Sequence, residues 1–244
     1  MNNKEWYQTW FGNDYLTVYA HRGDHEARKV INLILNYVCL EPQNRILDLC
    51  CGQGRHALYL ADLGYQVFGV DLSRTLLEIA KFRQTKNQPA YFIQADMRYL
   101  PIRNRFDLLL NLFTSFGYFE TDRENEEVFN QFYQALKPGG NFVFDYFNKS
   151  YVISHLVPYH KEQIEDVQVK QERFIEGSRV KKIITLNKAG KRSIFHESVK
   201  MYGPEELLLM FKKANLKVLQ IFGDYNGEAL DETSQRFIAI GQRQ

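Results

Sequence analysis

Short apolar runs and amphipathic stretches alternate along the middle of this chain. The apolar runs have the length of β-strands, and the stretches between them repeat apolar positions with the period of an α-helix. The runs that predict strands are 45–49, 66–70, 90–94, 105–111 and 141–147. Ser73 is the expected N-cap of a helix that ends near Arg83, and another helix is predicted over 125–136. Strands that are separated by helix-length segments indicate a parallel sheet with helices on both faces.

The pattern changes in the second half of the chain, where β-rich runs follow one another with only short turns between them. These runs are Glu165–Ile175, Arg179–Asn187 and Arg192–Val199. Gly177 and Gly190 stand in the two turns, and strands joined in this way predict an antiparallel β-meander. Pro204 then begins a predicted helix with glutamates in its first turn and lysines in its last, as the helix dipole favours. The sequence ends with two more predicted strands, 217–222 and 236–241.

The first 40 residues combine a set of aromatic side chains with one amphipathic helix. The aromatic residues are Trp6, Tyr7, Trp10, Phe11, Tyr15 and Tyr19. Asp24 is a candidate N-cap for the helix, which is predicted over 25–39 with its apolar positions on one stripe. So many aromatic side chains are not typical of a solvated tail. The segment is therefore expected to be either an apolar strap across the sheet or a lid that closes over a ligand and excludes water.

Composition and charge set further limits. The chain has 244 residues, of which 45% are apolar and 25% charged, so one α/β domain is expected rather than two. The formal net charge of +2 calls for neither nucleic acid nor an anionic membrane as a partner. Cys39, Cys50 and Cys51 make a poor disulfide framework and fit a reducing compartment, and no window is long and apolar enough for a membrane helix. A cytoplasmic protein is expected.

The first two predicted strands enclose a glycine-containing turn and a helix. Gly52, Gly54 and Ala57 fit the pattern G-x-G-x-x-A, which nucleotide-binding dehydrogenases also carry. Asp48 precedes this turn and Asp71 ends the second strand, so two acids flank the expected ligand. A negative charge at Asp48 would oppose a pyrophosphate, whereas it would favour a ligand with an ammonium or sulfonium group. The charge of the ligand therefore separates the two interpretations.

Four segments carry these glycines and the polar strand ends. They are ILDLCCGQGRHALYLADLGYQVFGVDLS, QADMRYLP, RFDLLLNLFTSFGYF and LKPGGNFVFDYFN, between Ile46 and Asn148. In this order they resemble the motifs of class I S-adenosylmethionine-dependent methyltransferases. The resemblance implies a doubly wound, seven-stranded Rossmann-like sheet with strand order 3-2-1-4-5-7-6, in which the last strand pair is antiparallel. It also implies S-adenosylmethionine as the cofactor, S-adenosylhomocysteine as the product, and no metal.

The same resemblance assigns cofactor contacts to single residues. For the methionine part it implies Asp48 and the backbone of Cys50, Cys51, Gly52 and Gly54, for the ribose hydroxyls Asp71 with its neighbour Leu72, and for the adenine Asp96 and Met97. For the wall near the sulfonium it implies Asn111 and Leu112, and for the methionine carboxylate, by a weaker transfer, Tyr19 and Arg22. The alternative for the acids is that they cap strand ends. Both adjacent cysteines are expected to be small turn residues rather than nucleophiles or metal ligands.

The expected reaction asks little of the protein. Methyl transfer from a sulfonium is an in-line displacement, so catalysis can come mainly from holding the reacting atoms in line and away from water. A general base is needed only when the acceptor arrives protonated. Tyr118 and His196 are the candidate catalytic residues, with Tyr15 a weaker one, although a surface position on a strand is the favoured interpretation of His196. The loop 114–117 either turns the chain or contacts the substrate.

Two features favour a small acceptor. The segment HESVKMYGPEELLLMFKKANLKV is similar to small-molecule methyltransferases, including sugar-amine N,N-dimethyltransferases. The residues 111–114, Asn-Leu-Phe-Thr, differ from the N/D-P-P-Y/F motif that would indicate methylation of an adenine amino group. A small molecule methylated on N or O is therefore expected, within a single domain, 1–244. In it, residues 1–40 form an aromatic lid and helix, and an inserted β-meander, 151–200, covers the substrate site.

Three alternatives stay open. The predicted hairpin is basic, through Arg179, Lys181, Lys182, Lys188, Lys191 and Arg192. A solvated face explains these charges, and contact with RNA in an RNA methyltransferase is the functional alternative, although nucleic acid is not the expected partner. The second alternative is a non-catalytic S-adenosylmethionine-binding protein. The third is a dinucleotide dehydrogenase, on the grounds of fold alone.

Overall fold

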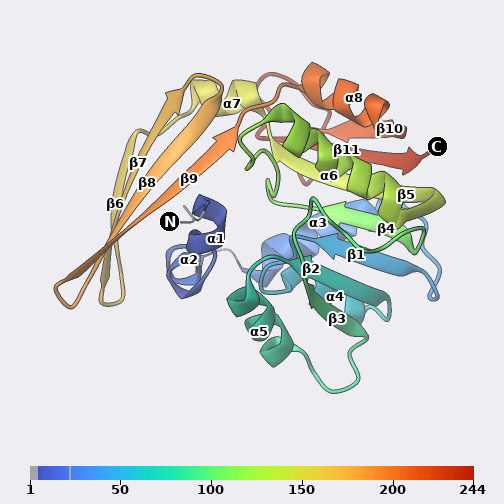
Figure 1. The fold of residues 1–244 in the computed structure, drawn as a ribbon, viewed down its shortest axis with the longest axis horizontal. Coiled ribbons are helices and arrows are strands. Elements are labelled where there is room, and N and C mark those ends of the chain that lie inside the picture. The colour runs from blue at the N-terminus through green and yellow to red at the C-terminus, as the bar shows by residue number, and fades with distance from the viewer. Residues whose placement is uncertain (1–4, 22) are drawn as a thin grey trace.

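The computed structural model describes residues 5–21 and 23–244, and its main body is a seven-stranded sheet (Figure 1). In spatial order the strands are β3 (Ala90–Gln94), β2 (Gln66–Asp71), β1 (Arg45–Leu49), β4 (Phe106–Asn111), β5 (Leu136–Phe147), β11 (Arg236–Arg243) and β10 (Leu216–Phe222). The first five strands run parallel, and β11 pairs antiparallel with β5 and with β10. The predicted strand order and the antiparallel pair at the end are confirmed.

Helices cover both faces of this sheet. They are α3 (Asp24–Tyr37), α4 (Arg55–Asp62), α5 (Arg74–Arg83), α6 (Asp122–Ala135) and α8 (Pro204–Lys213). The apolar side chains of α3 and α4 pack on one face with Ile46 and Leu108, and those of α6 and α8 pack on the other with Leu47 and Leu109. Successive strand residues point to opposite faces, so these apolar strands supply both cores. In residues 5–21 and 23–244, none of the helices combines the length and the hydropathy that a membrane span requires.

A second sheet of four antiparallel strands stands beside the first (Figure 1). It follows the short helix α7 (Lys149–Ser154) and consists of β6 (Tyr159–Ile164), β7 (Val167–Glu176), β8 (Arg179–Lys188) and β9 (Lys191–Lys200). Three of these strands match the predicted runs, whereas β6 was missed. Its sequence, YHKEQI, is largely polar and exposed, so no apolar alternation marks it. Backbone pairing with β7 along its whole length defines this strand instead.

The N-terminal aromatic segment forms two short helices, α1 (Trp6–Trp10) and α2 (Asn13–Val18), which lie between the two sheets in Figure 1. Trp10 packs with Val169 and Ile184 of the second sheet in a small core of its own. On the other side, the Ser73 hydroxyl donates a hydrogen bond of 2.6 Å to the carbonyl of Phe11. The segment therefore connects both sheets.

Two predicted helix starts differ from the structure. Asp24 is the first residue of α3 and not its N-cap, which is Gly23. The Asp24 carboxylate instead lies 2.8 Å from the guanidinium of Arg83. Helix α6 begins three residues earlier than predicted, at Asp122, because Thr121 and Glu124 form a capping box there.

Candidate functional site

A cavity of about 920 Å³ lies at the carboxyl ends of the parallel strands. One part of its wall is built by the ends of β1, β2 and β4 and the turns that follow them. The remainder comes from α1, α2 and α7 and from side chains of the second sheet. Pockets for one drug-sized ligand span about 300 to 1,000 Å³, so this cavity lies at the upper end of that range. Its position agrees with the rule that open α/β sheets bind ligands beyond the carboxyl ends of their strands.

The turn between β1 and α4 depends on residues with positive φ. Cys50, Gly52 and Gly54 have φ values of 63°, 56° and 79°. The N–H of Gly52 donates a hydrogen bond of 2.8 Å to the carboxylate of Asp71, which ties the turn to the end of β2. A Cβ atom at Gly54 would lie 3.0 Å from the Cβ of Ala80 in α5. Gly54 therefore permits close packing of α4 and α5, whereas Gly52 lines the cavity.

Asp48 lines the cavity and has a buried carboxylate oxygen without a hydrogen-bond partner in the described part of the chain. The residue is 1% exposed, and no partner for its Oδ2 atom exists within the described residues. Burial raises the pKa of this carboxyl group to about 7, although a hydrogen bond from the backbone of Ala57 opposes the shift. A buried polar atom without a partner is costly, so Asp48 is suited to a ligand that brings a cationic hydrogen-bond donor.

Asp71 both holds the turn after β1 and lines the cavity. Its Oδ2 accepts the N–H of Gly52, and its Oδ1 accepts the N–H of Ser73, each at 2.8 Å. Burial nevertheless raises the pKa of its carboxyl group, and these hydrogen bonds oppose the rise. Each carboxylate oxygen can accept a further hydrogen bond, and Asp71 lines the cavity together with Leu72. The side chain can therefore hold the turn and still bind a ligand hydroxyl.

An arginine holds Asp96 in place. The guanidinium of Arg98 lies 2.7 Å from the Asp96 carboxylate and 2.7 Å from that of Glu124 on α6. It also packs over the ring of Phe119 at 4.1 Å from the centroid. Asp96 and its neighbour Met97 both line the cavity. The third strand end is thus fixed by a partly buried network of ion pairs, which leaves little freedom to the Asp96 side chain.

Aromatic rings surround Tyr118 in the loop after β4. The centroid of its ring lies 4.9 Å from that of Trp6, 5.9 Å from Phe11 and 6.3 Å from Tyr7. All four residues line the cavity. Burial raises the pKa of the Tyr118 phenol well above its ordinary range. The phenol therefore stays protonated at neutral pH, so it can donate a hydrogen bond but cannot act as a general base.

Glu197 of β9 joins the second sheet to the N-terminal helices. It accepts hydrogen bonds from Trp10 Nε1 at 2.7 Å and from the Tyr19 hydroxyl at 2.9 Å, and its other oxygen lies 2.9 Å from Lys182 Nζ. The ion pair with Lys182 and these hydrogen bonds lower the pKa of Glu197, against the effect of its burial. The carboxylate is therefore ionised and held, which fixes one wall of the cavity.

Comparisons with known proteins identify the family. Residues 46–140 match the family model of a methyltransferase domain. YqeM of Bacillus subtilis (strain 168), which is named as a methyltransferase, is 27% identical to this chain, and the match covers 84% of this chain and 86% of YqeM. The dTDP-3-amino-3,6-dideoxy-alpha-D-glucopyranose N,N-dimethyltransferase of Streptomyces fradiae is 33% identical over 39% of this chain and 36% of its own. The fold matches a solved S-adenosylmethionine-dependent methyltransferase from Clostridium acetobutylicum ATCC 824 with a TM-score of 0.80 at 23% identity, over 95% of this chain and 98% of that one. Residues 46–140 are therefore a methyltransferase domain, and the fold of the chain is that of S-adenosylmethionine-dependent methyltransferases.

The methyltransferase brings most of the predicted cofactor residues together at the cavity. Those that line it are Tyr19, Asp48, Cys50, Cys51, Gly52, Asp71, Leu72, Asp96, Met97 and Leu112. Asn111 is fully buried behind this wall, where its amide donates to the carbonyls of Leu49 and Ser115 at 3.3 and 3.2 Å. Asn111 is not among the residues that line the cavity, because it is still within β4 and only Leu112 lies past it. Arg22 lies outside the described residues.

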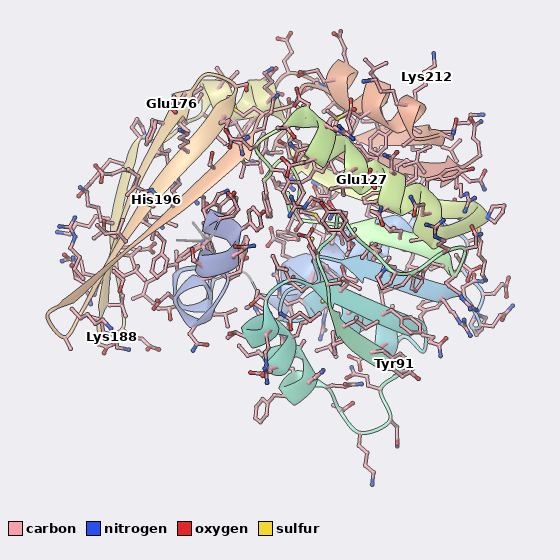
Figure 2. All side chains as sticks on the ribbon, viewed as in Figure 1. Tyr91, Glu127, Glu176, Lys188, His196 and Lys212 are labelled. Carbon is pink, nitrogen blue, oxygen red and sulfur yellow. The ribbon has the colours of Figure 1, made fainter. Side chains whose placement is uncertain are left out.

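His196 is not part of the cavity wall of the methyltransferase. It is labelled on β9 in Figure 2, and its side chain is exposed, whereas its neighbours Phe195 and Glu197 contact the N-terminal helices. Strand alternation explains this, because only every second residue of β9 can face inward. The geometry thus withdraws the support for a catalytic His196.

The cysteine thiols of the methyltransferase are not activated. Burial raises the pKa of Cys50 and of Cys51 well above the ordinary range, and the nearby carboxylates raise it further. Both are poor nucleophiles for this reason. In the part of the chain that the structure describes, no group of three or more His, Cys, Asp or Glu side chains is placed to hold a metal ion.

Several cavity residues of the methyltransferase were not predicted as site residues. They are His56, Phe113, Thr114, Ser115, Arg173 and Glu197, among others. The sequence left open whether Thr114 and Ser115 only turn the chain or contact the substrate. Both residues line the cavity. His56 falls on the buried face of α4, where the pattern indicates only a core position. Glu197 could have been found from strand alternation, because it is one residue from His196.

Proposed function

We propose that this methyltransferase transfers the methyl group of S-adenosylmethionine to an amine nitrogen of a small polar molecule. The observation that carries the proposal is the cavity itself, which continues from the strand ends to a space walled by aromatic rings and by the second sheet. Aromatic faces pack against the apolar parts of a small acceptor, and they attract the positive charge that an amine nitrogen gains while it is methylated. The name of the Streptomyces fradiae relative, an N,N-dimethyltransferase of an amino sugar nucleotide, supports an amine acceptor.

We place the cofactor along the strand ends. The unsatisfied Oδ2 of Asp48 fits the ammonium group of the methionine part, next to the backbone of residues 50–52. Asp71 keeps acceptor capacity for the ribose hydroxyls, and Asp96 with Met97 would meet the adenine. When bound, the cofactor supplies a methyl group on a sulfonium, which needs no metal and no covalent intermediate with the protein.

The residues of this chain would act by orientation and by excluding water. The rings of Trp6, Phe11 and Tyr118 form an apolar wall, and the protonated Tyr118 hydroxyl can donate a hydrogen bond to a polar group of the acceptor. Holding two reactants in a near-attack geometry is worth about 7 to 11 kcal/mol, which is a large share of an ordinary catalytic effect. An amine that binds as the free base needs no general base at this position.

The alternative of an RNA substrate loses much of its support. In the basic hairpin, Arg179 donates to the carbonyls of residues 117–119 and is not part of a surface strip. Lys181 pairs with Glu176, Lys182 with Glu197, and Lys188 with Asp166. Four of the six basic residues are thus engaged within the protein. Neutralised side chains contribute little to the counterion release that drives RNA binding.

A panel of acceptors tests the proposal. The enzyme would be incubated with S-adenosylmethionine and matched pairs of small molecules, each an amine and its hydroxyl analogue, for example an amino sugar and the parent sugar. We expect S-adenosylhomocysteine to form with amines and not with their analogues. Turnover on hydroxyl compounds alone, or on RNA alone, would contradict the proposal. Thermal stabilisation by S-adenosylhomocysteine but not by NAD serves as the control that the cofactor site is intact.

Tyr118→Phe should lower turnover about 3- to 10-fold with the best amine of that panel, because one neutral hydrogen bond to the acceptor is lost. The affinity for S-adenosylhomocysteine should stay the same, since the ring and its packing remain. Steady-state kinetics and calorimetric titration measure the two effects separately. Tyr59→Phe is the matched control, because the Tyr59 hydroxyl bonds Asn32 away from the cavity. Equal turnover of Tyr118→Phe and the parent enzyme would remove the hydroxyl from the proposed site.

A further inference from the structure

A second residue that lines the cavity, besides Asp48, carries a buried polar atom without a partner in residues 5–21 and 23–244. His56 is 6% exposed, lines the cavity, and its Nε2 atom has no hydrogen-bond partner among the described residues. The helix that carries His56 also contacts Asp48, because the Asp48 carboxylate accepts a hydrogen bond from the backbone of Ala57, the residue next to His56. Two unsatisfied atoms on residues that line one cavity are unusual in a folded protein, where buried polar groups are almost always paired. They indicate a ligand group that can satisfy both.

The charge state of His56 fits an acceptor role. Burial lowers the pKa of its imidazole to about 3, and the nearby Arg55 lowers it further. The ring is therefore neutral at every pH at which the enzyme is expected to work. A neutral imidazole has one nitrogen with a free lone pair, which can accept a hydrogen bond from an ammonium group.

The position of the imidazole is held by the loop after β4. The centroids of the Phe113 and His56 rings lie 5.3 Å apart. The guanidinium of Arg55 also packs against Phe113, at 4.9 Å from the centroid of its ring. Phe113 has a φ of 58°, a conformation that costs energy for a non-glycine residue and that persists only when its surroundings impose it. Its N–H donates to the Asp145 carboxylate at 2.9 Å, which supplies that constraint. The wall against which His56 packs is thus built and not incidental.

We propose that His56 is a cofactor-binding residue whose Nε2 accepts a hydrogen bond from the ammonium group of S-adenosylmethionine, together with Asp48 Oδ2. The inference rests on the cofactor placement proposed above. An ammonium group carries three N–H donors, so it can satisfy both protein atoms at the same time. The pair consists of one anion and one neutral acceptor, so it binds a single positive charge without an excess of negative charge.

Binding measurements with truncated ligands test this inference without any acceptor. Calorimetric titration would compare His56→Phe with the parent enzyme, using S-adenosylhomocysteine and 5′-methylthioadenosine, which lacks the amino-acid part. We expect affinity for S-adenosylhomocysteine to fall about 10- to 100-fold, the range for a hydrogen bond to a charged group, and affinity for 5′-methylthioadenosine to stay unchanged. His56→Gln, which keeps a polar atom near the position of Nε2, should lose less.

Decarboxylated S-adenosylmethionine identifies the group that His56 meets. If His56 binds the ammonium group, His56→Phe should weaken this ligand as much as it weakens S-adenosylhomocysteine. Full affinity of the variant for the decarboxylated ligand would place His56 at the carboxylate and overturn the inference, as would an equal loss for 5′-methylthioadenosine. The variant should fold, because it replaces an unsatisfied polar atom with an apolar ring of similar shape, and melting of the free protein checks this. An enzyme that shows the expected binding but no turnover on amines would contradict the proposed acceptor alone.

Discussion

Asp48→Asn is expected to stabilise the ligand-free enzyme above neutral pH and to weaken its binding of the cofactor. The folded-state pKa of Asp48, about 7, lies above its ordinary value of 3.8, so the unfolded chain loses this proton more readily than the folded one. The free energy of unfolding therefore falls as the pH rises from about 4 to about 7, by about 4 kcal/mol in total. Asparagine carries no charge and avoids this loss.

Denaturant unfolding between pH 4 and pH 9 measures the effect. The difference between Asp48→Asn and the parent enzyme should grow up to about pH 7 and stay constant above it. Asp62→Asn, on the exposed end of α4, is the control and should run parallel to the parent enzyme at all pH values. Parallel curves for Asp48→Asn as well would show that the carboxyl group titrates normally, and would contradict the buried charge.

The same proton governs cofactor binding. An ammonium group favours the ionised carboxylate, so the parent enzyme should bind S-adenosylhomocysteine more tightly as the pH rises through 7. Binding at pH 7 should release part of a proton, which titrations in buffers of different ionisation enthalpy detect. Asp48→Asn should bind more weakly and with no such pH dependence near 7. The variant thus exchanges binding for stability, as is common at functional sites.

The sequence predicted the main sheet well because its strands are short, apolar and separated by helices. The ends of the first two predicted strands placed Asp48 and Asp71 at the same edge, and the resemblance to methyltransferases assigned Asp96 to the same site. The second sheet was harder, because β6 has no apolar face and is defined only by its pairing partner.

Two predicted site residues, Asn111 and His196, do not line the cavity, and in each case the next residue does. Asn111 is the last residue of β4 and points into the core, and the wall begins one residue later. His196 and Glu197 are adjacent on β9, and only the second faces the N-terminal helices. Neighbouring residues of a strand point to opposite faces of the sheet. Where two neighbouring residues are both polar, the local sequence does not show which of them faces the site.

Contacts between distant segments also could not be read from local patterns. The raised pKa of Tyr118 depends on its burial under aromatic residues that lie more than a hundred positions earlier in the chain. Likewise, the buried face of α4 indicates a core helix whether or not a ligand lies beside His56. The unsatisfied atoms that mark the site exist only in three dimensions.

Asp145→Asn is expected to destabilise the enzyme by about 3 to 5 kcal/mol, the range for breaking a buried ion pair from one side. The Asp145 carboxylate is fully buried and lies 2.7 Å from the guanidinium of Arg236, which is only 19% exposed. It also accepts hydrogen bonds from the Tyr225 hydroxyl at 2.8 Å and from the N–H of Phe113. Asparagine removes the charge that compensates Arg236. Denaturant unfolding measures the loss, with Asp166→Asn as the control.

The control isolates the effect of burial. Asp166 pairs with Lys188, but both side chains are 62% exposed, so its replacement should cost less than about 1 kcal/mol. The double variant Asp145→Asn with Arg236→Met removes both buried charges and should recover part of the lost stability. If Asp145→Asn costs no more than Asp166→Asn, the cluster does not contribute the expected ion-pair energy.

The double variant should not recover the wall of the cofactor site. Phe113 and Thr114 have φ values of 58° and 61°. The Asp145 carboxylate accepts the N–H of Phe113 at 2.9 Å, and the Asp145 backbone carbonyl accepts the N–H of Thr114 at 3.0 Å. A left-handed conformation costs about 1 to 2 kcal/mol per residue, so the loop should relax when the side-chain acceptor is weakened. Faster hydrogen exchange in residues 112–118 and weaker binding of S-adenosylhomocysteine should therefore persist in the double variant. Their recovery along with stability would mean that the ion pair, and not the strained loop, positions this wall.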